Sequence, residues 1–487
     1  MSERQYIDFK LYLTKPDDDE AACEVTLLPT PEVGESMRPV SVTIPQTDPP
    51  FSDLLDGLSD KSISIRDLIK LGKILADCLL PMEGQIRSLF EDAWRQAGTS
   101  GGVRLRLIIA DDALRQWPWE YTYLNPTEGT EAEDTMRGFL ILDPRISIVR
   151  HEALPRPHAS VPEAETDITD MRMLVATAMP GSERELDLKK EVKKITEAIK
   201  DFDVDGVRIT CDPILTDVTY DELRDALLHT KPVHIFHFAG HGVVGDVKRN
   251  RVARGAMVEE GQLLLVKDKV AKEQDPLSAS DLAPMLLSAD VRLAVLNACL
   301  TGSRSKYSPW DSVAGALVWQ GIPAIIAMQY EVEDEPAIVF NDALYTTLSS
   351  GLSLDEAMSA GRLAMLKSVD LEDSKKSCVE WGVPVLYSRL VDGKVFPERM
   401  ARAGAVAEQF RHVFTQNVER VEKNGEVIGV SVERVGSSVQ VTQDIGVVLG
   451  RVVGIEADKL ESGSSTSVNQ KVEKVEGTLV GAKIKNL

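Results

Sequence analysis

Two short apolar runs, each followed by a turn with a reactive side chain, constrain the fold of this chain more than any other feature. The first run, Val233–Phe238, leads into Ala239–Gly242, and the second, Val291–Ala298, leads into Cys299–Gly302. Both are too short for a helix and are typical of buried strands in a parallel sheet. Because functional groups of open α/β sheets collect at the carboxyl ends of strands, we expect the two turns to meet at one sheet edge.

His241 and Cys299 bring acid–base and nucleophilic groups to that edge. Cysteine hydrolases need a thiolate, a proton donor for the leaving group and hydrogen-bond donors for the oxyanion. Cys299 is the candidate nucleophile, His241 the candidate proton donor, and the backbone N–H groups of Gly242 and Cys299 the candidate oxyanion hole. Each side chain alone is more simply explained as a bonded loop histidine or a buried thiol, but their joint placement in glycine-containing turns favours catalysis.

Other polar residues nearby allow more than one role. His234 and His237 alternate with phenylalanines and are expected on a sheet face, where His237 either forms a hydrogen bond behind the site or lines a substrate pocket. Asp311 precedes a predicted helix over 312–320, so it is either the N-cap or an acceptor for a basic substrate side chain. The histidines have no carboxylate or thiolate cluster beside them, so we predict no metal site and no cofactor.

Residues 171–390 alternate between strands and helices. This alternation predicts an α/β fold, a mostly parallel sheet with helices on both faces. The predicted helices are 183–200, 220–229, 278–287, 312–320, 336–349 and 353–367.

The preceding residues mix β-like stretches with one helical segment from Ser64 to Gln96. Prolines at 155, 157 and 162 indicate a linker. We therefore predict an α+β supporting domain at 1–155 and the α/β domain at 169–395. The charged, glycine-containing stretch from Val243 to Gln262 is a predicted lid.

The last part of the chain contains a repeat. Gln416, Gln443 and Gln470 are spaced by 27 residues, and each unit carries glycines around an apolar pair. The pattern predicts a β-rich module at 405–487, either stacked or repeated hairpins or a simple antiparallel meander. Its Val- and Gly-rich strand edges can pair with a partner by β-augmentation.

Composition restricts the partners and the compartment. The formal net charge of −22 argues against nucleic acid and anionic membranes as partners. Five scattered cysteines without CxxC pairing suggest a reducing compartment. The start of the sequence lacks a signal-peptide pattern and no apolar run approaches a membrane span, so the expected location is the cytoplasm.

Several motifs resemble the CHAT domain, a caspase-like cysteine peptidase family in the clan of separase and the caspases. The resemblance covers most of residues 100–390 and does not reach the C-terminal repeats. The matching segments are Trp117–Glu120, Leu142–Arg145, His237–Gly242, Gly261–Leu265, Leu296–Cys299, Gly321–Gln329, Asp334 and Trp381–Tyr387.

The resemblance places the family's catalytic dyad at His241 and Cys299 and implies a protein substrate. Bacterial members often act as effectors that a sensor switches on, which implies a sensor or adaptor partner for residues 405–487. Two alternatives remain open: a catalytically inactive scaffold of the same fold, and a hydrolase acting on another amide or a thioester.

Overall fold

A computed structural model gives the arrangement of the chain, which divides into two compact units, residues 1–397 and 398–487. Each unit is described separately. The structure describes residues 4–16, 22–35, 38–124, 136–151, 170–181, 183, 186–200, 203–204, 207–229, 232–248, 257–300, 309–368 and 379–395, and six strands of the second unit.

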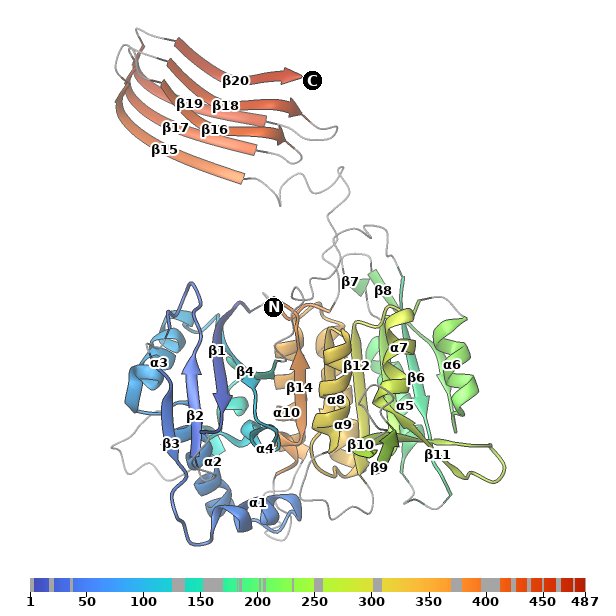
Figure 1. Ribbon diagram of the computed structural model, residues 1–487. Coiled ribbons are helices and arrows are strands. Elements are labelled where there is room, and N and C mark those ends of the chain that lie inside the picture. Colours follow the sequence, from blue (N-terminus) through green and yellow to red (C-terminus); the bar gives the residue numbers. More distant parts are fainter. Residues whose placement is uncertain are drawn as a thin grey trace. The chain divides into compact units, whose positions relative to one another are not determined.

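The first unit is built around one large sheet (Figure 1). Its described strands are β1 (Tyr6–Thr14), β2 (Ala22–Leu27), β3 (Val40–Thr43), β4 (Gly102–Ile109), β5 (Ile146–Arg150), β6 (Asp170–Thr177), β7 (Asp203–Val204), β8 (Val207–Leu215), β9 (Ile235–Lys248), β10 (Met257–Val266), β11 (Gln274–Ser278), β12 (Leu293–Leu300), β13 (Ala324–Met328) and β14 (Pro384–Ser388). Twelve of them follow the order β3-β2-β1-β4-β5-β14-β13-β12-β9-β6-β8-β7, and β10 and β11 extend from β9.

Helices cover both faces of this sheet. The α-helices are α1 (Phe51–Ser59), α2 (Ile65–Leu79), α3 (Ile86–Ala97), α4 (Asp112–Arg115), α5 (Leu188–Ile199), α6 (Tyr220–Leu228), α7 (Ala279–Ser288), α8 (Pro309–Gln320), α9 (Asp334–Leu348) and α10 (Leu354–Ser368). Apolar residues of α5, α9 and α10 belong to one core cluster, and those of α6, α7 and α8 to a second. The predicted mostly parallel sheet with helices on both faces is thereby confirmed.

The strands before and after the predicted linker belong to the same sheet. β4 pairs with β5, and β5 pairs in parallel with β14 near the end of the unit. The predicted boundary, residues 155–169, lies outside the described residues. The predicted supporting domain and α/β domain are therefore joined edge to edge in one compact unit.

The predicted helix from Ser64 to Gln96 is two helices, α2 and α3. Pro81 follows α2, and its ring and missing N–H prevent the helix from continuing. Gly84 and Gln85 then adopt positive φ values of 67° and 64°, which reverses the chain before α3. The periodicity of the apolar residues had indicated a single helix because both helices bury one face against the same core.

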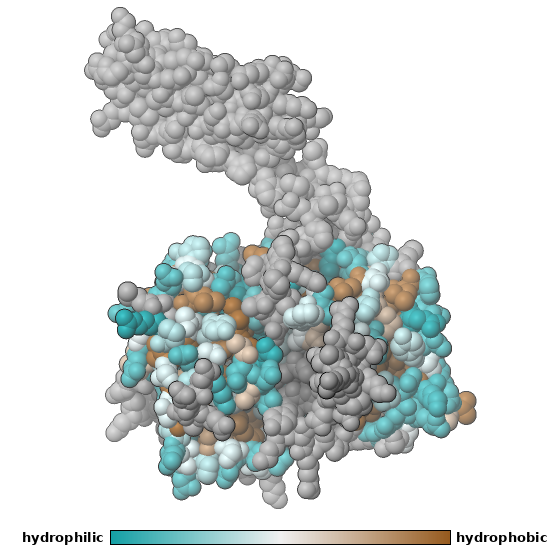
Figure 2. Space-filling model, viewed as in Figure 1, coloured by the Kyte–Doolittle hydropathy of each residue, from teal (hydrophilic) through white to brown (hydrophobic). Residues whose placement is uncertain are grey.

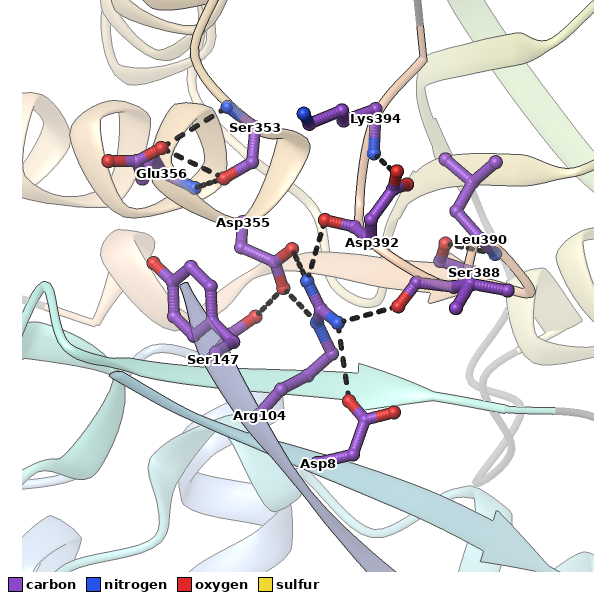
Figure 3. Close-up of polar contacts among 12 residues, drawn as sticks. Asp8, Arg104, Ser147, Ser353, Asp355, Glu356, Ser388, Leu390, Asp392 and Lys394 are labelled. Carbon is purple, nitrogen blue, oxygen red and sulfur yellow. Dashed lines mark hydrogen bonds and ion pairs between the residues drawn. The ribbon is translucent and has the colours of Figure 1, made fainter. Parts of the chain in front are cut away.

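A buried cluster of charged residues connects strands β1, β4 and β5 to α10 and to the loop after β14. Arg104 of β4 donates from Nε to Asp355 Oδ1 at 2.9 Å and from Nη2 to Asp355 Oδ2 at 2.6 Å, and Ser147 of β5 donates to the same carboxylate at 2.6 Å (Figure 3). Arg104 also donates to Asp8 of β1 at 3.2 Å and to the carbonyl of Val391 at 3.0 Å. We call Asp8, Arg104, Ser147 and Asp355 the Asp355 cluster.

The charges in this cluster compensate each other. Burial opposes ionisation of Asp355, but Arg104 and the hydrogen bond from Ser147 outweigh it and hold the pKa of this carboxyl below its usual value. The bidentate geometry is the strongest form of such a pair. The Asp355 cluster thus locks α10 and the loop after β14 onto the N-terminal strands.

The second unit consists of two parallel three-stranded sheets. One contains β15 (His412–Val421), β17 (Val439–Val448) and β19 (Thr466–Val475), and the other contains β16 (Glu426–Val435), β18 (Arg451–Leu460) and β20 (Thr478–Asn486). Gln416, Gln443 and Gln470 occupy matching positions on three neighbouring strands. Each 27-residue unit therefore gives one strand to each sheet, whereas a meander would pair its strands antiparallel.

One face of the first unit is mainly polar among its described residues. On the face drawn in Figure 2 hydrophilic residues dominate the coloured area, and apolar residues are scattered between them. Trp319 on α8 is 60% exposed and Val270 is 96% exposed, but single exposed apolar side chains are normal on protein surfaces. Such a surface fits the high proportion of charged residues, 27%, in the sequence.

Candidate functional site

His241 lies inside a long strand and not in a turn. β9 continues past Phe238 to Lys248, so the prediction of a glycine turn at this point was wrong. The reason is a change of partner: β9 pairs in parallel with β6 up to Ala239, and from His241 onward it pairs antiparallel with β10. The strand thus keeps hydrogen-bonding neighbours beyond the point where β6 ends.

The same pairing changes the interpretation of the predicted lid. The residues from Val243 to Lys248 pair with Met257–Gln262 as two strands of a hairpin. The intervening residues 249–256 lie outside the described part of the chain. The stretch is therefore at least partly an ordered extension of the sheet.

Gly240 is required for close packing. A Cβ atom at this position would lie 2.7 Å from the carbonyl oxygen of Ala178, and 3.1 Å from the ring of Phe238. No side chain fits at 2.7 Å from a backbone atom without movement. The glycine before His241 therefore lets the end of β6 approach β9, where Ala178 N–H donates to the Ala239 carbonyl at 3.2 Å.

Cys299 and His241 are Cα partners on neighbouring parallel strands, β12 and β9. Adjacent strands are about 4.8 Å apart, so the two backbones lie side by side at these positions. His241 is 1% exposed. The side chain of Cys299 lies outside the described atoms. Gly242, predicted with Cys299 to form the oxyanion hole, is in register with Leu300 on β12 and Leu263 on β10.

His237 is completely buried and does not line an open pocket. Its Nε2 contacts Glu191 Oε1 at 3.1 Å, and its Nδ1 contacts the hydroxyl of Tyr345 at 2.9 Å. Burial raises the pKa of Tyr345 well above its usual value, so the hydroxyl that contacts Nδ1 keeps its proton. Of the two predicted roles, a hydrogen bond behind the site is the one that this burial allows.

Sequence reasoning missed Glu191 and Tyr345, which contact the His237 ring, and the two asparagines that donate to Glu191. Glu191 Oε1 also accepts from Asn297 Nδ2 at 2.6 Å and from Asn341 Nδ2 at 2.9 Å. A signal for Glu191 was present: it is spaced by four residues from Ile195, which in turn is spaced by four from Ile199, and all three are buried. A glutamate in the apolar stripe of an amphipathic helix has to find partners in the core.

Asp311 is the third residue of α8, which begins at Pro309. The predicted N-cap role was therefore wrong, because the helix starts earlier than residue 312. Proline is favoured at the first position of a helix, and an acidic residue in the first turn interacts favourably with the helix dipole. The side chain of Asp311 lies outside the described atoms, so its predicted contact with a basic substrate group stays a prediction.

His234 lies at the start of the same strand region but is separate from the cluster around Glu191. Its Nδ1 accepts a hydrogen bond from the backbone N–H of Arg172 at 3.0 Å. Burial, together with the nearby charge of Arg292, lowers the pKa of His234 to about 4. The ring is therefore neutral at physiological pH.

The described residues contain no candidate for a metal centre or for a membrane-spanning helix. Among them, no group of three or more His, Cys, Asp or Glu side chains could hold a metal ion. None of the described helices has the length and apolar composition needed to cross a membrane.

Comparisons with known proteins identify a family match. Residues 70–389 match the model of the CHAT domain. A comparison with curated proteins gave no match.

Three solved structures are similar at low sequence identity. Gingipain R (RGPB), an Arg-specific cysteine proteinase, has 11% identity and a TM-score of 0.36, with 72% of this chain and 76% of that chain covered. The Saccharomyces cerevisiae separase–securin complex has 9% identity and a TM-score of 0.42, with 79% and 30% covered. The complex of the Porphyromonas gingivalis RgpB pro- and mature domains has 13% identity and a TM-score of 0.35, with 72% and 77% covered.

Proposed function

Because the chain belongs to the CHAT domain family, whose model spans residues 70–389, we propose that it is a cysteine endopeptidase that cleaves protein substrates through His241 and Cys299. The observation that supports this most is the register of the two residues. They are Cα partners on the adjacent strands β9 and β12, which is where a nucleophile and its acid–base partner can act on one bound peptide.

In the proposed reaction, the sulfur of Cys299 loses its proton with the help of His241 and attacks the carbonyl carbon of the peptide bond. The developing oxyanion accepts hydrogen bonds from the backbone N–H groups of Gly242 and Cys299. The C–N bond then breaks, and the departing amine takes a proton from His241. Water hydrolyses the thioester, which releases the carboxylic acid and restores the thiol.

Labelling with a thiol-reactive peptide electrophile tests the proposal. The native chain should be labelled at Cys299, and Cys299→Ala should abolish both labelling and peptide hydrolysis. His241→Ala should reduce the labelling rate by about 100-fold or more, because a general acid–base contributes about 10²–10⁴-fold.

Cys211→Ser is the matched control, because burial raises the pKa of the Cys211 thiol to about 11 and keeps it protonated at neutral pH. This variant should label like the native chain. Labelling that persists in Cys299→Ala, or a native chain that labels nowhere, rejects the dyad. The second result leaves a non-catalytic scaffold as the function. A substrate panel of peptides, other amides and thioesters identifies which bond is cleaved.

Asp311 allows a proposal about specificity. Its carboxylate would favour a substrate with Arg or Lys through a charge-assisted hydrogen bond. Asp311→Asn should then lower kcat/KM for basic peptides and leave neutral peptides unchanged. An equal change for both kinds of peptide would show that Asp311 acts on the helix and not on the substrate.

We propose that residues 405–487 recruit a sensor or adaptor protein in the cytoplasm. The support is the repeat of 27 residues and the parallel strands, whose outer edges can accept another strand. The chain divides at residue 397, so a truncation after 404 should leave the labelling of Cys299 intact and remove activation or targeting. A truncated protein that still responds normally to its physiological trigger would show that this role is wrong.

A further inference from the structure

Glu191 is a buried acid that the proposed reaction does not use. It lies on α5, and its side chain is 7% exposed. One of its oxygens, Oε1, accepts three hydrogen bonds: from Asn297 at 2.6 Å, from Asn341 at 2.9 Å and from His237 at 3.1 Å. With Tyr345, which bonds to the other nitrogen of His237, these residues form the Glu191 cluster.

Two of the three donors lie on the strands that carry the proposed dyad. Asn297 precedes Cys299 by two residues on β12, which is about 7 Å along a strand. His237 precedes His241 by four residues on β9, about 13 Å along the strand. Residues two or four positions apart in a strand lie on the same face of the sheet, so His237 and His241 share a face. The Glu191 carboxylate thus joins β9 and β12 on the face where His241 lies.

The third donor fixes the carboxylate to a second helix. Asn341 and Tyr345 both lie on α9, which packs beside α5 over the same core cluster. Asn341 and His237 are 0% exposed. The carboxylate is therefore held between two helices and two strands, and any shift of β9 relative to β12 has to stretch a hydrogen bond to it.

We infer that Glu191 is a positioning residue for the proposed peptidase reaction. Its carboxylate fixes the position of β9 relative to β12 along the strand direction, and therefore the position of His241 relative to Cys299. The inference rests on the proposed function. Misplacing reacting groups by about 1 Å can reduce a rate by about 100-fold. Substrate binding does not require the same accuracy, so the loss should fall on kcat.

Glu191→Gln is the decisive variant. Glutamine keeps the length and an oxygen that can still accept from the three donors, but it removes the negative charge that strengthens these hydrogen bonds. The reaction rate is measured with a fluorogenic peptide and divided by the number of sites that the electrophile labels, which removes any effect of unfolded protein. We expect kcat per labelled site to fall by about 10- to 100-fold, with KM changed by less than about twofold.

Asp355→Asn is the matched control. It removes the charge of another fully bonded, buried carboxylate in the same unit, but one that contacts β4 and β5 and neither of the dyad strands (Figure 3). This variant should lose stability and keep its kcat per labelled site within about twofold of the native value. A merely structural role of Glu191 predicts the same behaviour for both variants.

Tyr345→Phe provides a milder test if Glu191→Gln does not fold. It removes only the hydroxyl that bonds to His237, and we expect kcat per labelled site to fall by about fivefold at unchanged KM, since one hydrogen bond is worth roughly 1 kcal/mol. The inference is overturned if the labelled variants turn over at the native rate, or if Asp355→Asn loses as much kcat as Glu191→Gln. A native chain without labelling or hydrolysis rejects the proposed function, and the positioning role with it.

Discussion

Two buried carboxylates lie against the same sheet, Asp355 beside β4 and β5 and Glu191 beside β9 and β12, and they are satisfied in different ways. Asp355 receives a bidentate guanidinium from Arg104 and a hydroxyl from Ser147. Glu191 receives two side-chain amides and an imidazole. The first acid is paired with a guanidinium, whereas the described partners of the second are two amides and an imidazole and include no arginine or lysine.

This difference distinguishes a carboxylate with a structural role from one with a functional role. When a buried carboxylate is paired with an arginine, the ion pair offsets the energy needed to remove the carboxylate from water. The Asp355 cluster can therefore serve simply to dock α10 on the N-terminal strands. A buried carboxylate that relies on amides and an imidazole, without an arginine, is a more costly arrangement. Its position next to the proposed dyad suggests that function maintains it, because proteins depart from favourable packing mainly at functional sites.

The largest stability effect should come from the Asp355 cluster. Asp355→Asn leaves Arg104 buried without its carboxylate, and removal of one partner of a buried pair costs about 3–5 kcal/mol. The free energy of unfolding, measured with denaturant on the first unit, should fall by that amount. A loss below about 1 kcal/mol would mean that Asp8, which also bonds to Arg104, is a sufficient partner, and the two clusters would then differ less than proposed.

Gly240→Ala should disturb the dyad strands from the face of the sheet that lies opposite to Glu191. The new Cβ would lie 2.7 Å from the Ala178 carbonyl, and overpacking of this kind costs about 1–3 kcal/mol. If the position of β9 controls the reaction, kcat per labelled site should fall as it does in Glu191→Gln. A variant with lower stability but native kcat would show that the Glu191 charge matters and the strand position does not.

His234 should determine how stability changes between neutral pH and pH 4. Its pKa is about 4 in the folded protein and about 6.5 when unfolded, so the unfolded chain binds more protons in this window. The contribution of His234 to the free energy of unfolding is therefore complete above pH 6.5. It decreases as the pH falls toward 4, by about 1–2 kcal/mol once solvent screening is allowed for. Asp355 behaves differently, because its lowered pKa keeps the carboxylate ionised to a lower pH than an ordinary aspartate.

His234→Asn isolates this contribution. Asparagine can still accept the hydrogen bond from the Arg172 backbone, but it does not titrate. Denaturant unfolding curves at pH 7 and pH 4.5 should differ less in this variant than in the native chain. An unchanged difference would assign the acid sensitivity to a group other than His234.

The smallest effect on stability and activity is expected for an exposed ion pair between α5, which carries Glu191, and α9, which donates a hydrogen bond to it. Lys190 of α5 and Glu335 of α9 form an exposed pair at 2.8 Å. Such pairs contribute little because water screens them. Lys190→Ala should leave the unfolding midpoint and kcat unchanged within error. A loss of kcat would indicate that the docking of α5 on α9 controls the reaction, and the special role of the buried carboxylate would be withdrawn.

Local patterns in the sequence were sufficient to predict much of the fold. The apolar runs around Phe236 and Val295 predicted neighbouring buried strands, and the helical periodicity predicted α5 and α6 to within a few residues at most ends. These predictions succeeded because side-chain burial follows a fixed period along a strand or a helix. The same reasoning failed at Pro81, where two helices share one apolar face, and at His241, where a new strand partner extends β9.

The Glu191 cluster could not be predicted in the same way. Glu191 is separated by 46 residues from His237, by 106 from Asn297 and by 150 from Asn341. No local period connects residues so far apart, and a glutamate on a helix is usually exposed. Its place in the apolar stripe of α5 indicates only that it needs partners.

By itself, the sequence predicted most of the strands and helices, the meeting of His241 and Cys299 at one edge of the sheet, and the repeat of 27 residues. These features depend on the order of apolar and polar side chains along a short segment. The tertiary structure alone decided that the N-terminal strands join the same sheet, that β9 continues beyond His241, and that a buried carboxylate connects the two strands of the proposed dyad. Those outcomes depend on hydrogen bonds between distant segments, which form only when the packed core brings them together.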